Sequence, residues 1–414
     1  MKKVIALVLV LMLTLSMAAL ADTSICTTAD EIELTGDPSA IKLGLVCIGD
    51  ENEGYSYAHI KGFTEACEAL GVSEDQYTIK YNIPETAAAY DACADLADAG
   101  CDAVFCISYG HQTFVQQAAQ EFPEVQFVAV TGDQANAANL DNLSNAFNNI
   151  FEARYVSGVA AGLKINEMLE NGEITDENLD EDGNVKIGYV GAFPYAEVVS
   201  GYTSFFLGAR SQCPTVSMEV SYVNSWADII AEQAAAEALI ADGCAIICQH
   251  SDTTGPSKAV QAAQDAGKKV YSVGYNISML SVAPTAALTS SHMKWDVYYT
   301  YAIKTAINGE KIARNWCGGY TQNAVGLTEF GEAAVQSDIY AEVEAKIASG
   351  EIKVFDTSTF TVGGETVTNA FATDTDGDFA NDADEAIIDG AYTESYFQSA
   401  PSFSLRIDGI TELN

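Results

Sequence analysis

The sequence predicts an α/β protein with two similar Rossmann-like lobes, each built around a parallel sheet. The first observation is an internal repeat: ACADLADAGCDAVFCISYG at residues 92–110 resembles AAAEALIADGCAIICQHSDT at residues 234–253. Each copy has an alanine-rich helix that ends at a glycine (Gly100 or Gly243), then a β-branched strand, then small polar residues. The second observation is the length of 414 residues, which is too long for one ordinary core. The third is the regular alternation of strand and helix patterns around each copy, which is typical of parallel sheets.

The first lobe is predicted at residues 41–148, and the chain is expected to return to it at residues 288–327. A polar tether at residues 22–40 precedes this lobe, and the acidic, glycine-containing stretch 49–59 is expected to be a loop. The predicted strands are 41–48, 77–83, 102–108, 125–130 and 143–147, and the predicted helices are 60–70, 86–99 and 111–121.

The second lobe is predicted at residues 149–287, and it begins with a helix whose glycines and alanines suit close packing: Gly158, Ala161 and Gly162. After a surface loop, the same alternation returns, with strands at 185–191, 216–223, 244–248 and 269–275 and helices at 197–211, 227–241 and 256–266. A strand at 286–290 and an amphipathic helix at 295–307 follow. Residues 328–414 are expected to form a C-terminal extension that has a helix at 333–349 and ends in an acidic tail.

Residues 1–21 have the pattern of a secretory signal peptide. Two lysines precede an apolar run at residues 4–13, and Ala19-Leu20-Ala21 supplies small residues for cleavage. The apolar run is shorter than a membrane-spanning helix requires, so a removed leader is favoured over an anchor. We therefore expect an exported protein, in the periplasm or at the outer face of the cell membrane. A lipid anchor at Cys26 stays open, because Ile25 stands where lipoprotein processing prefers a small residue.

The net charge of −39 disfavours nucleic acid and anionic lipid as partners, since binding either one requires clustered lysine and arginine. A neutral or cationic ligand is favoured for the same reason. The ten cysteines lie mainly in helix and strand patterns, so most are expected to be small buried apolar residues. Cys244 and Cys248 are four residues apart on one predicted strand and cannot bridge each other.

Aromatic residues with hydrogen-bonding neighbours follow one predicted strand after another, and Tyr275 with its neighbour Asn276 ends the strand predicted at 269–275. In open α/β sheets, the loops after the strands form the ligand crevice. Rings supply faces for stacking, and their neighbours supply donors and acceptors, as a flat ring compound or a sugar requires. Taken singly, each aromatic is also compatible with simple core packing. The residues expected to line the cleft are Tyr55, Ser56, His59, Ser108, Tyr109, Phe193, Asn224, Trp226, His250, Asp252 and Asn276.

The sequence has no recognisable catalytic set and no phosphate-binding glycine loop, so we expect neither an enzyme nor a nucleotide cofactor. His250 and Asp252 could be two metal ligands, but nothing near them in the sequence completes a site. The acidic tail partly fits a calcium loop, although Phe379 stands where the sharp turn needs glycine, and a solvated loop is the alternative. The candidate calcium ligands are Asp374, Asp376, Asp378 and Glu385.

From residue 41 to residue 327 the chain resembles the basic membrane protein family. These proteins are substrate-binding components of ABC importers and are related to purine nucleoside receptors. The resemblance is carried by GYSYAH, AGCDAVFCISYG, EFPEVQFVAVTG, RYVSGVAAG, IGYVGAFPYAEVVSGYTSFFLGAR, VNSWAD, CQHSDTTGPSKAVQAA and VGYNISM. It implies the type I periplasmic-binding-protein fold, a small-molecule ligand, an ABC permease as partner and a monomer.

The resemblance further implies that a purine base lies between Tyr55 and Trp226, with Trp295 among the lining residues together with four already named: Phe193, Asn224, His250 and Asp252. Two departures bear on ribose. Residues 274–278 read GYNIS where the nucleoside receptors have GxDxD, and Met293 lies near the place of their pocket lysine. The expected ligand is therefore a purine nucleoside, a free base or another small ring compound. A sugar or signal-molecule sensor on the same fold and a calcium-dependent surface interaction protein are the alternatives.

Overall fold

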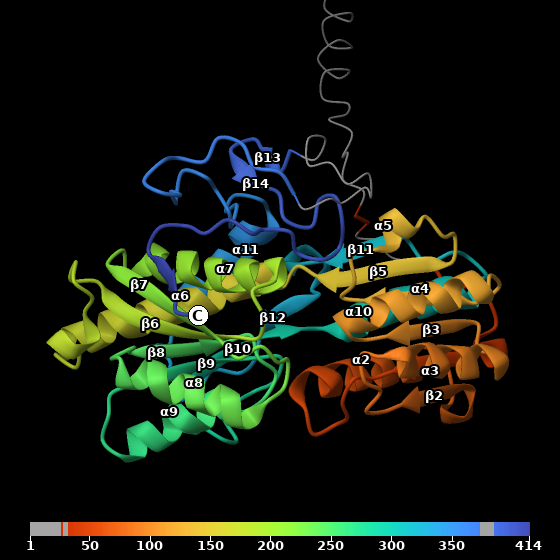
Figure 1. The fold of residues 1–414 in the computed structure, drawn as a ribbon, viewed down its shortest axis with the longest axis horizontal. Coiled ribbons are helices and arrows are strands. Elements are labelled where there is room, and N and C mark those ends of the chain that lie inside the picture. The colour runs from red at the N-terminus through yellow and green to blue at the C-terminus, as the bar shows by residue number, and fades with distance from the viewer. Residues whose placement is uncertain (1–25, 28–31, 373–384) are drawn as a thin grey trace, which may run out of the picture.

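The computed structural model describes residues 26–27, 32–372 and 385–414, and its main feature is a pair of sheets that lie end to end (Figure 1). The first sheet is wholly parallel and has the order β2-β1-β3-β4-β5-β11. Its strands are β1 (Leu43–Val46), β2 (Tyr77–Lys80), β3 (Ala103–Cys106), β4 (Gln126–Val130), β5 (Leu143–Asn148) and β11 (Asn315–Gly318). Its helices are α2 (Gly54–Leu70), α3 (Ala87–Asp98), α4 (Gln112–Glu121), α5 (Ala135–Ala138) and α10 (Trp295–Ile307).

The second sheet has the corresponding order β7-β6-β8-β9-β10-β12, with β15 added outside β7. All neighbours are parallel except β12, which runs antiparallel to β10. Its strands are β6 (Val185–Gly191), β7 (Val216–Tyr222), β8 (Ile246–Gln249), β9 (Tyr271–Tyr275), β10 (Ala287–Met293), β12 (Val325–Leu327) and β15 (Ile410–Glu412). Its helices are α6 (Ile150–Glu170), α7 (Ala196–Gln212), α8 (Ile229–Ala241) and α9 (Gly255–Asp265). The matching strand orders confirm the predicted pair of similar halves.

The repeat that predicted this duplication ends its helices in the same way in both lobes. Gly100 follows α3 and Gly243 follows α8, with φ angles of 84° and 97°. The next residue in each copy closes the helix with a backbone bond, from Cys101 N to the Leu96 carbonyl (3.1 Å) and from Cys244 N to the Leu239 carbonyl (3.0 Å). Glycine suits these positions because left-handed backbone strains other residues.

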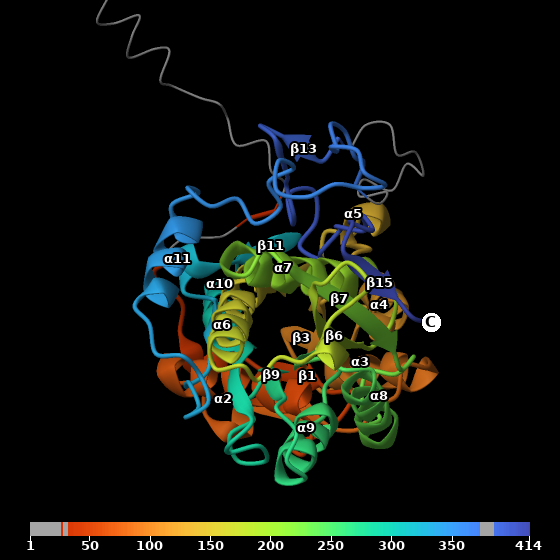
Figure 2. The ribbon, with the colours of Figure 1, turned by 90° about the vertical axis from the view of Figure 1, so that its left-hand side faces the viewer.

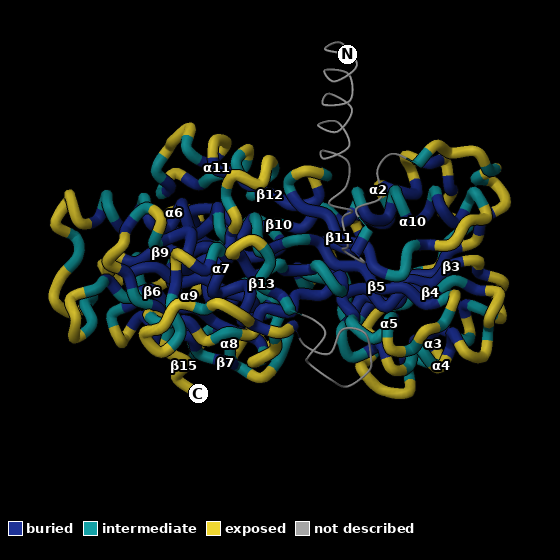
Figure 3. Tube along the Cα trace, turned by 90° about the horizontal axis from the view of Figure 1, so that it is seen from above, coloured by how far each residue is buried: buried dark blue, intermediate teal, exposed yellow. Residues whose placement is uncertain are grey.

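Each sheet is covered by helices on both faces, so its inner strands, such as β1, β3, β5 and β8, are buried on both sides (Figure 3). Phe63 of α2 and Tyr299 of α10 pack on one face of the first sheet, and Val115 of α4 packs on the other. In the second lobe, α6 and α7 cover one face, and α8 and α9 cover the other. Strands that are buried on both faces have continuous apolar sequences, such as AVFC in β3.

The segment 288–327 is divided between the two sheets instead of lying wholly in the first lobe. β10 pairs with β9, and β12 pairs with β10, so both strands extend the second sheet. Only the part between them belongs to the first lobe, where α10 packs on α2 and β11 pairs with β5. The reason is that the backbone of β10 forms its hydrogen bonds with β9, and the chain passes to the first lobe only after β10 ends.

Helix α2 begins at Gly54, six residues before the predicted start. The carboxylate of Glu53 accepts hydrogen bonds from the backbone N–H groups of Tyr55 and Ser56 and so caps the helix. The stretch predicted as a loop after β1 is therefore partly helical, and Tyr55 lies in the first turn of α2.

The predicted small-residue face of α6 lies against α7 (Figure 2). A Cβ atom built on Gly158 would lie 2.0 Å from the Phe205 carbonyl oxygen, and one on Gly208 would lie 2.0 Å from the Tyr155 carbonyl oxygen. The two helix backbones approach this closely only because both positions lack side chains.

The C-terminal extension covers the second lobe and also contacts the first. It contains α11 (Ile339–Ala348), which is shorter than predicted, and the small hairpin β13 (Ile387–Ile388) and β14 (Ala391–Tyr392). Phe403 stacks on Phe355 with ring centroids 4.3 Å apart. At the first lobe, Asn136 Nδ2 donates to the Phe397 carbonyl (3.1 Å), and Ser399 N donates to Asn315 Oδ1 (3.2 Å). Within the described ranges, we find no helix with the length and apolar character needed to cross a membrane.

Candidate ligand-binding site between the two sheets

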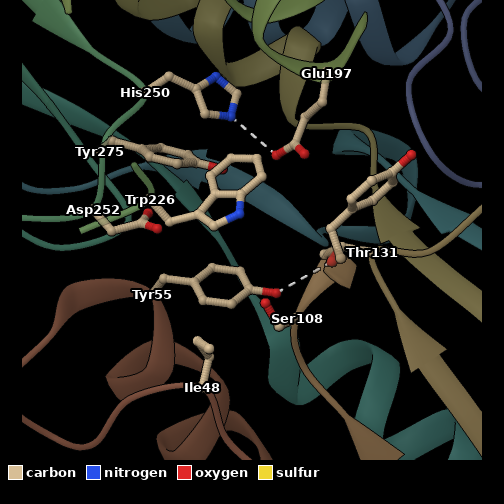
Figure 4. A pocket seen from close by; sticks show the side chains of 10 residues that line it. Ile48, Tyr55, Ser108, Thr131, Glu197, Trp226, His250, Asp252 and Tyr275 are labelled. Atoms are coloured by element: carbon tan, nitrogen blue, oxygen red, sulfur yellow. Dashed lines mark hydrogen bonds and ion pairs between the residues drawn. The ribbon is translucent and has the colours of Figure 1, made fainter. Parts of the chain in front are cut away.

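A cavity lies where the carboxyl ends of the two sheets face each other (Figure 4). The empty space among its lining residues, counted together with the open solvent at its mouth, is about 370 Å³. Both lobes contribute to its wall, with Ile48, Tyr55, Ser108, Tyr109 and Thr131 from the first and Glu197, Trp226, His250, Asp252 and Tyr275 from the second. This is the position at which open α/β sheets bind ligands.

Most of these residues stand at the end of a strand or within four residues after it. Ser108 follows β3, Thr131 follows β4, Trp226 follows β7, and His250 follows β8, while Tyr275 ends β9. Thr131 adopts a φ of 67°, which is rare for a β-branched residue, and its N–H bonds to the Ala146 carbonyl (2.8 Å). The strand ends therefore bring residues that are distant in the sequence to one place.

Tyr55 and Trp226 supply aromatic rings from different lobes. Figure 4 shows the Trp226 indole above the Tyr55 phenol, with Asp252 beside them. The Tyr55 hydroxyl donates to the Ile107 carbonyl (2.5 Å), which fixes the ring against β3. Trp226 is held from behind by the edge of Phe193, with ring centroids 5.0 Å apart.

A hydrogen-bond relay connects buried Arg154 to the second-lobe wall of the cavity. Arg154 Nη1 donates to the Tyr189 hydroxyl (2.7 Å), which lies 3.4 Å from His250 Nδ1. His250 Nε2 lies 3.0 Å from Glu197 Oε1. Burial, assisted by the Arg154 cation, holds the pKa of His250 well below its usual value, so the ring is neutral at pH 7. In the tautomer that fits both contacts, Nδ1 accepts from Tyr189 and Nε2–H donates to Glu197.

The carboxyl groups at the cavity hold their protons more tightly than free side chains do. Burial raises the pKa of Glu197 to about 7. Burial and the neighbouring carboxylates, Glu53 first among them, raise the pKa of Asp252 well above its ordinary range. Asn276 Nδ2 donates to Asp252 Oδ1 (3.2 Å). The wall can thus both donate and accept hydrogen bonds. A ligand that carries negative charge is disfavoured, because it would repel these carboxyl groups when they are ionised.

Six of the predicted site residues line this cavity: Tyr55, Ser108, Tyr109, Trp226, His250 and Asp252. Two others stand one layer behind it, where Phe193 packs on Trp226 and Asn276 bonds to Asp252. These two support lining residues instead of facing the cavity.

Four predicted residues lie elsewhere. His59 stacks on Trp295 (ring centroids 4.0 Å apart), and its Nδ1 lies 2.8 Å from the Tyr299 hydroxyl, so both residues belong to the first-lobe core. Ser56 Oγ accepts from Gly49 N (3.1 Å). Both errors on α2 follow from its early start, which winds a predicted loop into a helix and turns these side chains inward. Asn224 is exposed after β7, with a φ of 54°.

Tyr275, which was expected at the end of its strand beside the cleft, lines the cavity as well. Three lining residues are absent from the prediction: Ile48, Thr131 and Glu197. Ile48 and Thr131 stand at strand ends, and that position was the sequence signal that could have identified them. Glu197 lies in the first turn of α7, where acidic residues are common for helix stability alone, so its residue type gave no sign of a site.

Three predicted calcium ligands, Asp374, Asp376 and Asp378, lie outside the described residues. The fourth, Glu385, accepts backbone hydrogen bonds from Ala370 N and Ile387 N through Oε1, both at 3.0 Å. Within the parts of the chain that the structure describes, no group of three or more His, Cys, Asp or Glu side chains could hold a metal ion.

The buried carboxyls predict that the protein loses stability as the pH rises from 5 to 8. Burial raises the pKa values of Glu152, Glu197 and Glu394 to about 7 in the folded state. Over this range the unfolded chain releases protons that the folded protein keeps, so the free energy of unfolding falls. Thermal unfolding at intervals between pH 5 and pH 8 should show the midpoint decreasing by several degrees.

Substituting all three with glutamine should make this slope shallower, whereas Glu170→Gln at the exposed end of α6 should leave it unchanged. A melting temperature that rises steadily over the same range would contradict the assignment.

The chain resembles known proteins over most of its length. Residues 51–358 match the family model described as ABC transporter substrate-binding protein PnrA-like (Bmp). A purine-binding protein of Brucella abortus is 33% identical over 317 residues, which cover 76% of this chain and 83% of that protein. A putative ABC transporter glucose-binding protein of Haloferax volcanii is 29% identical over 342 residues, covering 81% and 80%.

A solved solute-binding protein of an ABC transporter from Aeropyrum pernix shares the fold. Its TM-score is 0.63 at 18% identity, and the match covers 76% of this chain and 93% of that one. The α/β architecture with two lobes is thus that of type I periplasmic solute-binding proteins, as the sequence predicted. Proteins of this class are extracytoplasmic and bind small molecules for a membrane permease. The chain belongs to the PnrA-like (Bmp) family of ABC transporter substrate-binding proteins.

Proposed function

We propose that this protein captures a neutral purine base, a purine nucleoside or a similar flat ring compound and delivers it to an ABC permease. The observation that carries the proposal is that Tyr55 and Trp226, from different lobes, line one cavity. A planar guest between the two rings would contact both lobes at once. Such contacts favour the closed form over the open one, which is how a ligand drives lobe closure.

The polar wall favours a ring compound with hydrogen-bonding edges. Asp252 and Glu197 can accept from ring N–H or amino groups when ionised and can donate to ring nitrogens when protonated. Stacking contributes about 1 kcal/mol per aromatic face beyond area burial. Each satisfied hydrogen bond adds about 1 kcal/mol. A phosphate would place negative charge beside these buried carboxyls, so nucleotides are poor ligands in this proposal.

Thermal-shift and calorimetric titration with purine bases, purine nucleosides, a nucleoside monophosphate and glucose would test this proposal. A true ligand raises the melting temperature by mass action, whereas a compound that does not bind leaves it unchanged. Mass spectrometry of small molecules released from the purified protein identifies the natural ligand directly. We expect a base or nucleoside to bind and the monophosphate to fail. The absence of any shift with every purine would contradict the proposal.

A sugar is the second candidate, favoured by the similarity to a putative glucose-binding protein. Sugars also stack on aromatic rings and bond to carboxylates through their hydroxyl groups. The same titration separates the candidates, because only a sugar receptor would respond to glucose or a related monosaccharide while ignoring the bases.

The proposal includes export through a leader at residues 1–21 and a monomeric, non-catalytic receptor. Intact-mass analysis of the mature chain tests both the cleavage site and acylation of Cys26, since a lipid would add the mass of its acyl chains. Calcium binding by the acidic tail is tested by adding calcium and a chelator in turn to the thermal-shift assay.

A further inference from the structure

Two buried cysteines meet inside the first lobe. Cys93 on α3 and Cys106 on β3 bring their Sγ atoms to 3.2 Å from each other. Both side chains are fully buried. They lie within an apolar cluster that includes Leu96, Val104 and Val115. Two thiols in such surroundings gain little from hydrogen bonding, because S–H is a weak donor and sulfur a weak acceptor.

We infer that Cys93 and Cys106 are joined by a disulfide in the exported protein. The S–S bond is about 2.05 Å long, so the sulfurs need to approach by only about 1 Å. The inference rests on the extracytoplasmic location of the family, where disulfides persist, and not on the identity of the ligand.

The step is a thiol–disulfide exchange with an oxidised dithiol carrier of the extracytoplasmic space. One cysteine thiolate attacks the disulfide of the carrier and releases one carrier thiol. The second cysteine then attacks the mixed disulfide, which forms the Cys93–Cys106 bond and releases the second carrier thiol. The two cysteines lose two electrons and two protons in total, and the carrier gains them. Because both sulfurs are buried in the folded protein, exchange takes place while the lobe folds.

The bond would reinforce a connection that the fold already makes. Glu85, just before α3, accepts from Ser108 Oγ (2.6 Å) and from Gly110 N (2.8 Å) through Oε1. Ser108 follows β3 and lines the cavity. The hydrogen bonds and the disulfide would therefore both fix the α3 segment against the strand that carries this part of the cavity wall.

Peptide mapping of the exported protein tests the inference. The protein is purified without reductant, denatured and alkylated at once, so that only free thiols are modified. We expect a linked pair of peptides that contain unmodified Cys93 and Cys106. Alkylation of both residues would overturn the inference, as would a linkage of either one to a different cysteine.

A stability comparison gives an independent readout. Reductant should lower the melting temperature of the wild type by several degrees, because the unfolded chain loses a cross-link. Cys67→Ala, which changes a buried cysteine in another cluster, should keep this response, whereas the double variant Cys93→Ala/Cys106→Val should lose it. An identical response in wild type and double variant would overturn the inference. Neither measurement involves the ligand, so failure here leaves the proposed receptor function standing, and the reverse also holds.

Discussion

Replacing Trp226 by alanine is expected to raise the dissociation constant of the ligand at least tenfold. The indole forms one wall of the cavity, and its loss removes both the stacking contact and the apolar area that the ligand would cover. A factor of ten corresponds to about 1.4 kcal/mol, which is within the range of a lost aromatic contact. Isothermal titration with the identified ligand measures the change. Tyr55→Ala should produce a loss of similar size from the opposite lobe.

Tyr81→Ala is the matched control, because Tyr81 is a 42% exposed tyrosine just after β2 that does not line the cavity. Its dissociation constant should equal that of the wild type. Circular dichroism of Trp226→Ala should match the wild type as well, since Trp226 lies at the cavity and outside the fully buried core. An unchanged dissociation constant in Trp226→Ala would refute the proposal that the ligand lies between the rings of Tyr55 and Trp226.

Gly158→Ala is expected to cause a large loss of stability through a single added methyl group. The added Cβ would lie 2.0 Å from the Phe205 carbonyl oxygen and 2.9 Å from Ala209 N, and both are backbone atoms of α7. Since a backbone cannot change rotamer to make room, the two helices must separate and expose part of their shared core. Overpacking costs about 1–3 kcal/mol and occasionally more, and we expect the upper end of this range because both close contacts are with backbone atoms. Denaturation with urea measures the resulting decrease in the free energy of unfolding.

Glu170→Ala is the control on the same helix, because this glutamate is exposed at the end of α6. It should change the free energy of unfolding by less than about 0.5 kcal/mol, as surface substitutions usually do. If Gly158→Ala proved as mild as the control, the close α6–α7 contact would be wrong.

Local patterns were enough to predict the elements that carry strong periodic signals. The helix expected at residues 295–307 is α10 with the same bounds, and the strand expected at residues 185–191 is β6. The prediction failed at the start of α2, where the polar residue Glu53 caps a helix that begins inside the predicted loop. A single carboxylate that satisfies two backbone N–H groups decides that boundary, and its residue type alone is equally compatible with a loop.

Sheet membership was harder to predict than the elements themselves. Residues 286–290 were expected to form a strand, yet only pairing shows that this strand, β10, continues the second sheet while α10 and β11 return to the first. Strand pairing depends on partners far away in the sequence, and the local pattern of apolar residues does not identify which strand will be the neighbour.

By itself, the sequence determined the duplicated α/β architecture and the strand ends at which most of the cavity-lining residues gather. Helix periodicity, glycine stops and apolar strands are local properties, and the repeat displays them twice. Only the tertiary structure decided which of the strand-end residues meet. In the folded chain, Tyr55 and Trp226 line one cavity. His59 and Trp295 stack on each other in the first-lobe core, and Glu197 lies within hydrogen-bonding distance of His250. These outcomes depend on helix phase and on how two separate sheets face each other, which are properties of the packed chain and not of any short segment.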